Sequence, residues 1–460
     1  MKTRFYLFVI LTATCLALFS CGDDVTPEPL FEGDVILSSQ DAVNAAGRKG
    51  HIEITGSLII NDSANWEQSP ITDLSPLASI TTVSGDLVVK NTRELTNLDG
   101  LDNLESIGGN LTLTSNGGLL NIDALSNVTD YGQPDIILGG NFRLLSIQGL
   151  RGIELARSMQ IRNNNVLVSL EGLHNVRGVS GNLYLGDNWV LSSLAGFSGL
   201  TFVGGDLDIY GSELHDLQGL VSLDSIGGEM RIEYFHQMTD LSNLSQLSYV
   251  GTLYIGRNDQ LTSLNGLTNL RTIGHELRIE KSNGLTDLQG LESLTSGMDI
   301  ILTNNENLAS LKGLDNLEEV QLLASWNNPR LSDITALSKL RLVYDQLSIV
   351  GSEQLRTLTG LEGLKAVDRL GLSRNTILDN IDALQNVETL ASLTISENPK
   401  LVNLTAFQSL AVIDWFSIED NATLTDFCGV TDTNIRVSYR VLDNAFNPTQ
   451  DDLAAGRCRQ

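Results

Sequence analysis

The side chains with the clearest binding chemistry in this chain are tyrosines, arginines and carboxylates that recur at intervals of about 23 residues. Tyrosine and arginine are enriched at binding hot spots, and tyrosine faces also stack on sugars. An alternative is that tyrosine simply favours exposed strands, while opposite charges on neighbouring strands pair with one another. We predict a ligand-binding patch made of Tyr184, Asp208, Tyr210, Arg231, Glu233, Tyr254, Arg278 and Glu280.

Patterns typical of catalysis or of metal binding are missing from the sequence. There is no Ser/His/Asp arrangement, no phosphate-cradling glycine loop and no metal-ligand spacing among the five histidines. Acidic residues such as Asp99 and Glu171 stand at turn positions, where they shape turns or solvate the surface. We therefore predict no enzyme activity, no cofactor and no metal site.

A repeat that fills most of the chain must position the predicted patch. One example is the motif Leu-x-x-Leu-x-Gly-Leu at Leu95–Leu101, and each repeat also has an upstream apolar-x-apolar segment such as Leu111–Leu113. Such alternation predicts strands with one buried face, and a fixed period of this length indicates a solenoid. The central apolar position recurs every 23 to 25 residues, at 74, 98, 122, 147, 170, 194, 217, 241, 264, 288, 311, 334, 358, 381, 404 and 427.

An asparagine column predicts how the repeats stack. Three residues before the first leucine of the motif, asparagine stands at 116, 141, 164, 188, 258, 305, 328, 375, 398 and 421. Its amide carries a donor and an acceptor, so stacked asparagines can form a hydrogen-bonded ladder along the long axis. Other repeats break this column with Thr92, Gly211, Phe235, Ser282 and Ser352.

Stacking is also an energetic requirement. One repeat buries about six apolar side chains at about 1.5–3 kcal/mol each, while ordering its backbone costs about 1–2 kcal/mol per residue. A lone repeat is therefore unstable, and only burial between neighbours offsets the deficit. We expect the middle residue of each strand, and the residue after its second apolar position, to face solvent. Trp189, Phe235 and His236 lie at nearby turns and could edge the patch, although Phe235 could instead pack inward.

The predicted fold class is all-β: a right-handed parallel β-solenoid of about 16 rungs of 23–25 residues with a short N-terminal helical cap. We assign residues 34–57 to the N-terminal cap, including a short N-capped helix over 38–46. Residues 58–427 form the repeats, with one insertion that contains Trp66, and residues 428–460 form the C-terminal cap. Cys428 and Cys458 are an even pair in an exported chain, which predicts a disulfide.

The N-terminus predicts export and anchoring. Residues 1–20 have two basic residues followed by an apolar run, as a secretory signal does. The segment Leu18–Gly22 resembles the lipobox of bacterial lipoproteins, which implies lipidation at Cys21 and a lipidated tether over residues 21–33. An ordinary signal peptide with an incidental cysteine is the alternative. Asp23 and Asp24 resemble the acidic export tags of surface lipoproteins in Bacteroidetes-type bacteria, which implies a lipid-anchored, surface-exposed protein of the outer membrane.

The charge of the chain excludes two classes of partner. With 29 Lys+Arg against 56 Asp+Glu, the formal net charge is −27. Such a surface repels phosphate backbones and anionic lipids, so we expect no nucleic-acid partner and membrane contact only through the lipid anchor.

The repeats also resemble a known family. The rhythm from Leu98 to Gly109, Leu-x-Gly-Leu-x-x-Leu-x-x-Ile-Gly-Gly, is similar to the receptor L domain, a leucine-rich-repeat-related β-solenoid. The cap sequences Asp34–Ser39 and Asn444–Thr449 look like those of bacterial surface lipoproteins that carry such arrays. The resemblance implies a recognition or adhesion module for an extracellular protein or glycan. A structural envelope spacer without a ligand is the alternative, and a polysaccharide-acting β-helix enzyme is the third candidate.

Overall fold

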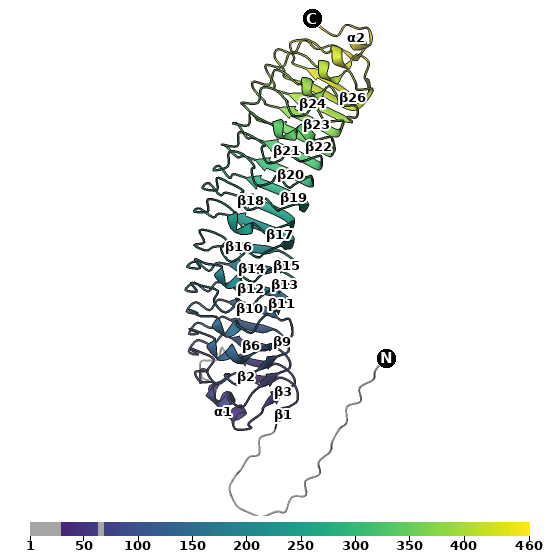
Figure 1. Cartoon of the computed structure of the whole chain (residues 1–460). Helices are drawn as coiled ribbons and strands as arrows, with labels where there is room; N and C mark the ends of the chain where they lie inside the picture. The colour runs from purple at the N-terminus through teal and green to yellow at the C-terminus, as the bar shows by residue number, and fades with distance from the viewer. Residues whose placement is uncertain (1–28, 63–68) are drawn as a thin grey trace, which may run out of the picture.

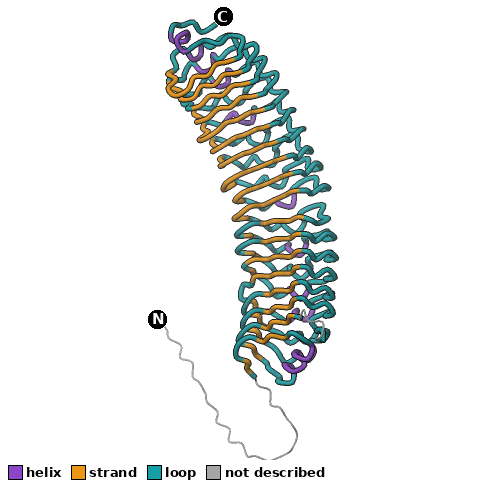
Figure 2. Tube along the Cα trace, turned by 180° about the vertical axis from the view of Figure 1, so that it is seen from behind, coloured by secondary structure: helices purple, strands orange, loops and turns teal. Residues whose placement is uncertain are grey.

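The apolar-x-apolar segments form strands, and each strand pairs in parallel with the same segment of the next repeat. In this computed structural model, residues 29–62 and 69–460 are described. The repeats wind into one elongated parallel β-solenoid that bends gently along its length (Figures 1 and 2). We call each winding of the coil a rung. The predicted all-β solenoid is confirmed, while residues 1–28, with Cys21, and residues 63–68, with Trp66, lie outside the described residues.

The main sheet runs the length of the coil. In chain order, its strands are β2 (Val35–Leu37), β4 (Leu58–Asn61), β6 (Leu87–Lys90), β8 (Leu111–Thr114), β10 (Asp135–Gly139), β12 (Ser158–Arg162), β14 (Leu183–Gly186), β16 (Leu207–Tyr210), β17 (Ser225–Glu233), β18 (Tyr249–Gly256), β19 (Thr272–Glu280), β20 (Ser296–Thr303), β21 (Glu319–Trp326), β22 (Leu342–Val350), β23 (Ala366–Ser373), β24 (Ser392–Ser396), β25 (Val412–Glu419) and β26 (Asn434–Leu442). Because β2 and β26 also pair in this sheet, the ladder of strands continues one rung beyond the predicted repeat range at each end.

Shorter strands precede the main strands in the N-terminal rungs. They are β1 (Leu30–Phe31), β3 (Glu53–Ile54), β5 (Thr82–Val83), β7 (Ser106–Ile107), β9 (Asp130–Tyr131), β11 (Leu155–Ala156), β13 (Gly178–Val179) and β15 (Phe202–Val203). From β17 onward, most rungs merge the short and the main strand into one longer strand, with shifts in register between the two parts.

Helical segments are short and lie between the strands or at the ends. The α-helices are α1 (Gln40–Gly47) and α2 (Gln450–Ala454), and the 3-10 helices are η1 (Ser75–Leu77), η2 (Asp123–Asn127), η3 (Gln148–Leu150), η4 (Ala195–Phe197), η5 (Ser242–Leu244), η6 (Thr335–Lys339), η7 (Asp382–Leu384), η8 (Thr405–Phe407) and η9 (Cys428–Val430). The predicted N-cap of the first helix is confirmed, since Ser39 Oγ accepts a hydrogen bond from the Ala42 N–H. No helix of the described residues is long and apolar enough to cross a membrane.

The asparagine ladder is confirmed, but its hydrogen bonds go mainly to backbone groups. Asn305 is buried, and its Nδ2 donates to the Ile279 carbonyl at 3.0 Å while its Oδ1 accepts from the Ser282 N–H at 3.0 Å. Both partners lie on the preceding rung. Each ladder asparagine therefore satisfies a buried donor and a buried acceptor of its neighbour, which ties successive rungs together.

One ladder position predicted from the sequence is wrong. Gly211 has a φ of 59° and so takes the left-handed place that precedes the ladder on other rungs, and Ser212 holds the ladder position itself. The Ser212 Oγ is buried and has no hydrogen-bond partner among the described residues. The prediction failed because the turn after Ser212 is one residue shorter than the same turn on neighbouring rungs. Counting three residues back from Leu214 therefore gives Gly211 instead of Ser212.

The glycine of the Leu-x-Gly-Leu motif is explained by close approach between rungs. Gly266 has a φ of 116°, and a Cβ added there would lie 1.8 Å from the carbonyl oxygen of Leu241 on the preceding rung. Only glycine fits this position without moving the backbone.

The C-terminal tail folds back over the last rung. The predicted disulfide between Cys428 and Cys458 is present, and the Phe427 N–H donates to the Cys458 carbonyl at 2.7 Å. Thr449 caps α2 through a reciprocal pair of hydrogen bonds with Asp452. The tail therefore covers the last rung of the apolar core.

Candidate functional site

The structure brings the eight predicted patch residues together on strands β14 to β19. Tyr184, Asp208, Arg231, Tyr254 and Arg278 occupy one register position on successive strands. Tyr210, Glu233 and Glu280 lie in the neighbouring column, which Gly186 and Gly256 also share. All eight side chains are half-buried rather than fully exposed. The predicted register is thus correct, and the binding role of the patch stays a prediction.

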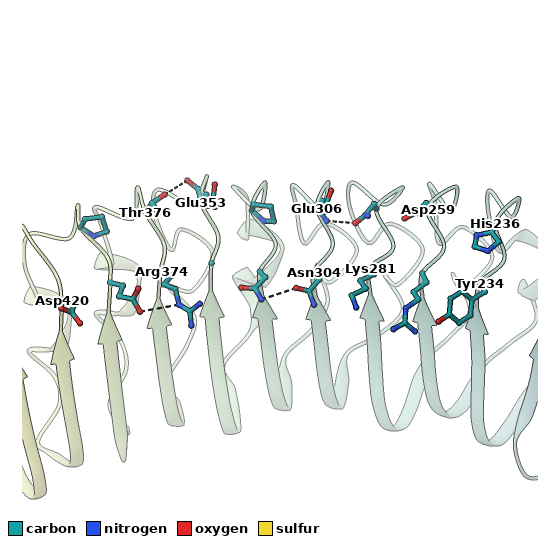
Figure 3. A pocket seen from close by; sticks show the side chains of 17 residues that line it. Tyr234, His236, Asp259, Lys281, Asn304, Glu306, Glu353, Arg374, Thr376 and Asp420 are labelled. Atoms are coloured by element: carbon teal, nitrogen blue, oxygen red, sulfur yellow. Dashed lines mark hydrogen bonds and ion pairs between the residues drawn. The ribbon is translucent and has the colours of Figure 1, made fainter.

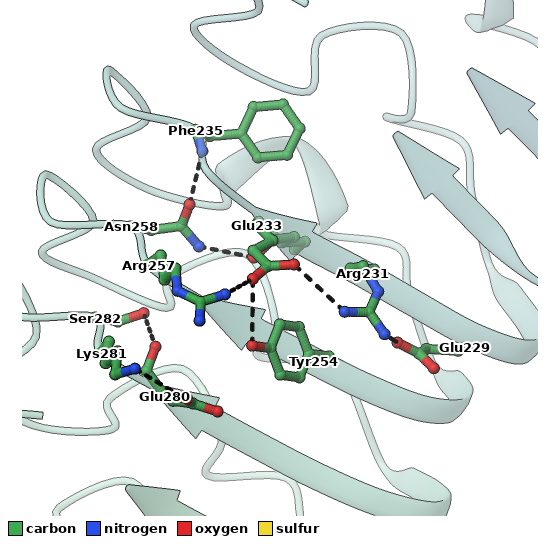
Figure 4. A network of polar contacts seen from close by, with 11 residues as sticks. Glu229, Arg231, Glu233, Phe235, Tyr254, Arg257, Asn258, Glu280, Lys281 and Ser282 are labelled. Atoms are coloured by element: carbon green, nitrogen blue, oxygen red, sulfur yellow. Dashed lines mark hydrogen bonds and ion pairs between the residues drawn. The ribbon is translucent and has the colours of Figure 1, made fainter. Parts of the chain in front are cut away.

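Glu233 is the centre of a polar network in this patch (Figure 4). It pairs with Arg231 at 3.3 Å and with Arg257, and its Oε1 accepts a hydrogen bond from the Tyr254 hydroxyl at 3.5 Å. Arg231 also pairs with Glu229 at 2.8 Å and lies 4.7 Å from the centre of the Tyr254 ring. Burial, followed by the charges of nearby carboxylates, raises the pKa of Tyr254. The arginines therefore already have partners within the protein.

The patch tyrosines pack beside small residues of the same sheet. The Tyr184 and Tyr210 rings meet edge to face at 5.3 Å. A Cβ added at Gly186 would lie 2.7 Å from the Tyr210 ring and 2.8 Å from the Tyr184 ring. Glycine in the second column therefore makes room for the rings, and this packing explains why they are only half exposed.

Asp208 differs from the other carboxylates of the patch. Its Oδ1 is buried and has no hydrogen-bond partner among the described residues. Burial raises the pKa of Asp208, and the positive charge of Arg231 partly offsets this effect. Of the patch side chains, it has the most evident unused hydrogen-bonding capacity.

The middle residues of the main strands do not all face solvent as predicted. Ile301, Ala324 and Ser348 are buried on three consecutive strands. Trp326 Nε1 donates a hydrogen bond to Ser348 Oγ at 2.9 Å, so the indole lies beside Ser348. The prediction was wrong here because it used alternation alone and ignored shielding by large neighbours.

A second surface, not predicted from the sequence, lies along the turns that follow the main strands. It is a groove of about 1300 Å³, open along one side, that extends over nine consecutive rungs from Tyr234 to Asp420 (Figure 3). Two parallel columns of side chains line it, one on each side of the ladder position. The column before the ladder contains Tyr234, Arg257, Lys281, Asn304, Asn327, Gly351, Arg374, Glu397 and Asp420, and the column after it contains His236, Asp259, Asn283, Glu306, Pro329, Glu353, Thr376 and Pro399.

The backbone explains why these side chains reach the surface at regular intervals. Residues of the first column adopt left-handed conformations, with φ of 50° at Lys281 and 57° at Asn304. The next residue turns inward as the ladder side chain, and the residue after it returns to the surface. We name the two outer positions the positive-φ column and the crest column. Both columns could have been located in the sequence, because their residues immediately flank each ladder asparagine.

The arginine and lysine side chains of the groove each have a carboxylate partner. Arg257 pairs with Glu233 of the patch, Lys281 lies 3.5 Å from Glu280, and Arg374 lies 3.6 Å from Glu397. Arg257 also lies 5.2 Å from the Tyr234 ring centre. The groove and the predicted patch thus form one connected surface, joined through Glu233, Glu280 and their cationic partners.

The three turn residues near the patch have different positions. Trp189 is 57% exposed on the crest column, and His236 is exposed at one end of the groove. Phe235 is 4% exposed and occupies a ladder position, where its N–H donates to Asn258 Oδ1 at 2.9 Å. Phe235 therefore packs inward. Among the described residues, no group of three or more His, Cys, Asp or Glu side chains could hold a metal ion.

Comparisons with known proteins agree with this architecture. Residues 51–172 match the family model described as Receptor L domain. Over these residues the chain is similar to receptor L domains, and the parallel pairing of the strands shows a β-solenoid. No curated protein is significantly similar in sequence.

Solved structures with a similar course of the chain are distant. An internalin from Listeria monocytogenes is 16% identical, with a TM-score of 0.34 and coverage of 89% of each chain. A plant peptide hormone receptor in complex with RGF2 is 14% identical, with a TM-score of 0.28 and coverage of 91% of this chain and 77% of the receptor. The Toll–Spatzle complex from Drosophila is also 14% identical, with a TM-score of 0.29 and coverage of 91% and 66%.

Proposed function

We propose that this protein is a lipid-anchored recognition module on the surface of a bacterial cell, where it holds an extended extracellular ligand along the groove. The observation that carries the proposal is the continuity of the groove over nine rungs. With about 4.8 Å between rungs, it offers about 40 Å of uninterrupted lining. The match to the Receptor L domain model supports a recognition role.

The chemistry of the lining suits reversible binding. Amides at Asn283, Asn304 and Asn327 both donate and accept hydrogen bonds, and the rings of Tyr234 and His236 supply flat contact surfaces. The half-buried patch on β14 to β19 adjoins this end of the groove and extends the proposed contact surface. We propose no catalytic step, so a bound ligand should be recovered unchanged.

Anchoring at Cys21 would place the groove outside the cell. The apolar chains attached to the cysteine would insert in the outer membrane, and the acidic residues that follow would accompany export to the surface. A structural spacer without a ligand is the second candidate; a uniform lining would favour it, whereas the groove varies in chemistry from rung to rung.

The test compares two sets of glycine substitutions in the positive-φ column. Asn304→Gly, Asn327→Gly and Arg374→Gly together remove groove side chains while the left-handed backbone is retained. Asn91→Gly, Ser115→Gly and Asp443→Gly together are the matched control outside the groove. Each chain is applied to glycan and extracellular-protein arrays. We expect the groove variant to lose about tenfold or more in affinity for the ligand that the unmodified chain captures, and the control to retain it.

Three results would contradict the proposal. Equal affinities of the groove and control variants would remove the groove from the binding site, and no captured ligand would favour the spacer. Release of a cleaved ligand would favour an enzyme.

The lipid anchor has its own test. Cys21→Ser should abolish incorporation of a labelled fatty acid, and continued labelling would exclude Cys21 as the lipidation site.

A further inference from the structure

Aromatic rings occupy the crest column on every second rung as the chain approaches the groove. Phe142, Trp189 and His236 each follow directly after a ladder position, and Asn165 and Glu213 stand at the same place on the rungs between them. Phe142 is 55% exposed and Trp189 is 57% exposed. We name these three rings the ring track. Phe142 and Trp189 are two of several large hydrophobic side chains that the coil leaves exposed, and their place on alternate rungs aligns them along one column.

The hydrogen bonds of the ladder fix the spacing of the rings. The Asn141 N–H donates to Asn164 Oδ1 at 3.3 Å, and the Asn164 N–H donates to Asn188 Oδ1 at 3.1 Å, so these rungs are directly stacked. With about 4.8 Å per rung, Phe142 and Trp189 stand about 10 Å apart along the axis. Two rings at this spacing can stack on every second unit of a linear polymer, provided that each unit adds about the height of one rung along the solenoid axis.

The ring track leads into the groove. His236 lies at its first rung together with Tyr234, and the two ring centres are 6.3 Å apart (Figure 3). A single line of contact therefore runs along the turns from Phe142 through the ring pair to the polar lining beyond. The aromatic part offers flat apolar faces, and the polar part offers carboxylates and amides that hydrogen-bond hydroxyl groups.

The charges of the groove disfavour a polyanionic ligand. The groove cations Arg257, Lys281 and Arg374 each lie within 4.0 Å of a carboxylate of this protein. The crest column adds Asp259, Glu306 and Glu353. A polyanion would find its cationic sites occupied and would also be repelled by the net charge of −27. A neutral chain that is rich in hydroxyl groups needs no free counter-charge.

The topology disfavours an extended peptide. Peptides that bind in extended form commonly add a strand to an open sheet edge. Here the strands of the main sheet from β4 to β25 each pair with a neighbour on both sides, and turns rather than a strand edge line the groove. The exposed Leu145 and Val168 beside the ring track are the features that a protein partner would use instead.

Extending the proposed function, on which this inference rests, we infer that the ring track and the groove bind a linear, uncharged polysaccharide that runs parallel to the solenoid axis. Sugar rings stack through their C–H faces on Phe142 and Trp189. Hydroxyl groups further along the chain hydrogen-bond to the groove lining.

Affinity electrophoresis of the full-length chain tests this inference. Native gels contain a β-1,4-glucan, a β-1,4-mannan, a xylan or an α-glucan, and heparin serves as a polyanionic probe. The double variant Phe142→Ala, Trp189→Ala removes two rings of the track. Phe202→Ala, Trp415→Ala is the matched control, since these residues are 36% and 50% exposed and lie outside the turns, on β15 and β25.

We expect at least one neutral polysaccharide to retard the unmodified chain. The ring-track variant should show about tenfold or greater weakening, and the control variant should bind as the unmodified chain does. Retardation by heparin alone, or equal weakening in both double variants, would overturn the inference. If no polysaccharide retards the chain while the glycine variants of the groove lose capture of an extracellular protein, the partner is a protein: this inference fails and the proposed function stands.

Discussion

The solenoid has an N-terminal half, up to β16, and a C-terminal half, from β17. Both halves share one apolar core, but outside this core their successive rungs are connected in different ways. In the N-terminal half, the chain turns a corner between the short and the main strand, and an Asp or Asn side chain bridges successive corners. Asp86 Oδ1 accepts from the Asn110 N–H at 2.7 Å, and Asn110 Oδ1 accepts from the Asp135 N–H at 2.9 Å. In the C-terminal half, longer strands replace most of these corners.

Ion pairs follow the same division. Of the fourteen between described residues, only Arg157–Asp135 lies before β17. Many of the others join neighbouring rungs, as Arg369–Asp345 and Arg440–Glu419 do. Exposed pairs of this kind contribute about 0–1 kcal/mol each, so they adjust stability rather than create it. The comparison teaches that the buried ladder is the common requirement, while the surface of each half is free to carry a different chemistry.

The ladder should therefore be equally important in both halves, and its loss should have the largest effect. Asn164→Ala and Asn305→Ala each leave a buried carbonyl and a buried N–H of the preceding rung without a partner. We expect each substitution to lower the free energy of unfolding by about 2–6 kcal/mol. Urea denaturation measures the loss, and hydrogen exchange of the adjacent rungs shows whether it is local.

Asn165→Ala is the control for the ladder substitutions. Asn165 is exposed and directly follows a ladder residue, so its replacement should change stability by less than about 0.5 kcal/mol. A ladder substitution that is tolerated in one half only would show that the halves differ in their core as well as on their surface.

Substitutions of two chosen glycines, one in each half, should differ in their effect by a smaller amount. A Cβ at Gly204, at a corner of the N-terminal half, would lie 2.1 Å from the Ser180 carbonyl oxygen. A Cβ at Gly297 in β20 would meet only Ile300, at 3.8 Å or more. Gly204→Ala should cost about 1–3 kcal/mol, and Gly297→Ala less than about 0.5 kcal/mol. Thermal unfolding measures both, and equal losses would contradict the close approach of rungs at the N-terminal corners.

The smallest predicted effect is on stability as a function of pH. One carboxylate in each half is compared, and the two should change stability in opposite directions as the pH rises. Burial raises the pKa of Asp208, so its contribution to stability is full below the ordinary value of 3.8 and is lost as the pH rises through the folded-state pKa. Hydrogen bonds from Arg440 and Ser417 lower the pKa of Glu419. Its contribution is therefore present above 4.5 and is lost as the pH falls through the folded-state pKa.

At pH 7, Asp208→Asn should stabilise the protein and Glu419→Gln should destabilise it, each by less than about 1 kcal/mol. Both differences should shrink towards pH 3. Urea denaturation at a series of pH values measures them, and changes of the same sign would show that the burial of Asp208 does not control its ionisation.

The fold could be predicted from the sequence because its determinants repeat. Leucines, ladder asparagines and the Leu-x-Gly-Leu glycine each have one physical role, and the role recurs on successive rungs. The error at Gly211 shows the limit of this reasoning, since one missing residue in a single turn displaces the register that counting assumes.

The site was harder to predict because it depends on shape. The register of Tyr184, Arg231 and Tyr254 followed from strand alternation, but the packing of the tyrosine rings beside Gly186 and Gly256 did not. The groove could not be predicted in this way, because strand alternation identifies exposed residues on strands and not on turns. Its lining lies on turns, where a groove arises only from how successive backbones are arranged in space.

The ladder has a consequence for how such a surface can change. Because the buried asparagine ties the rung through backbone groups, the residues on either side of it take little part in holding the coil together. Tyrosine, arginine, lysine, asparagine, glycine and glutamate all occupy the positive-φ column here. The side chains of these two columns can therefore change one position at a time, while the scaffold beneath them remains the same.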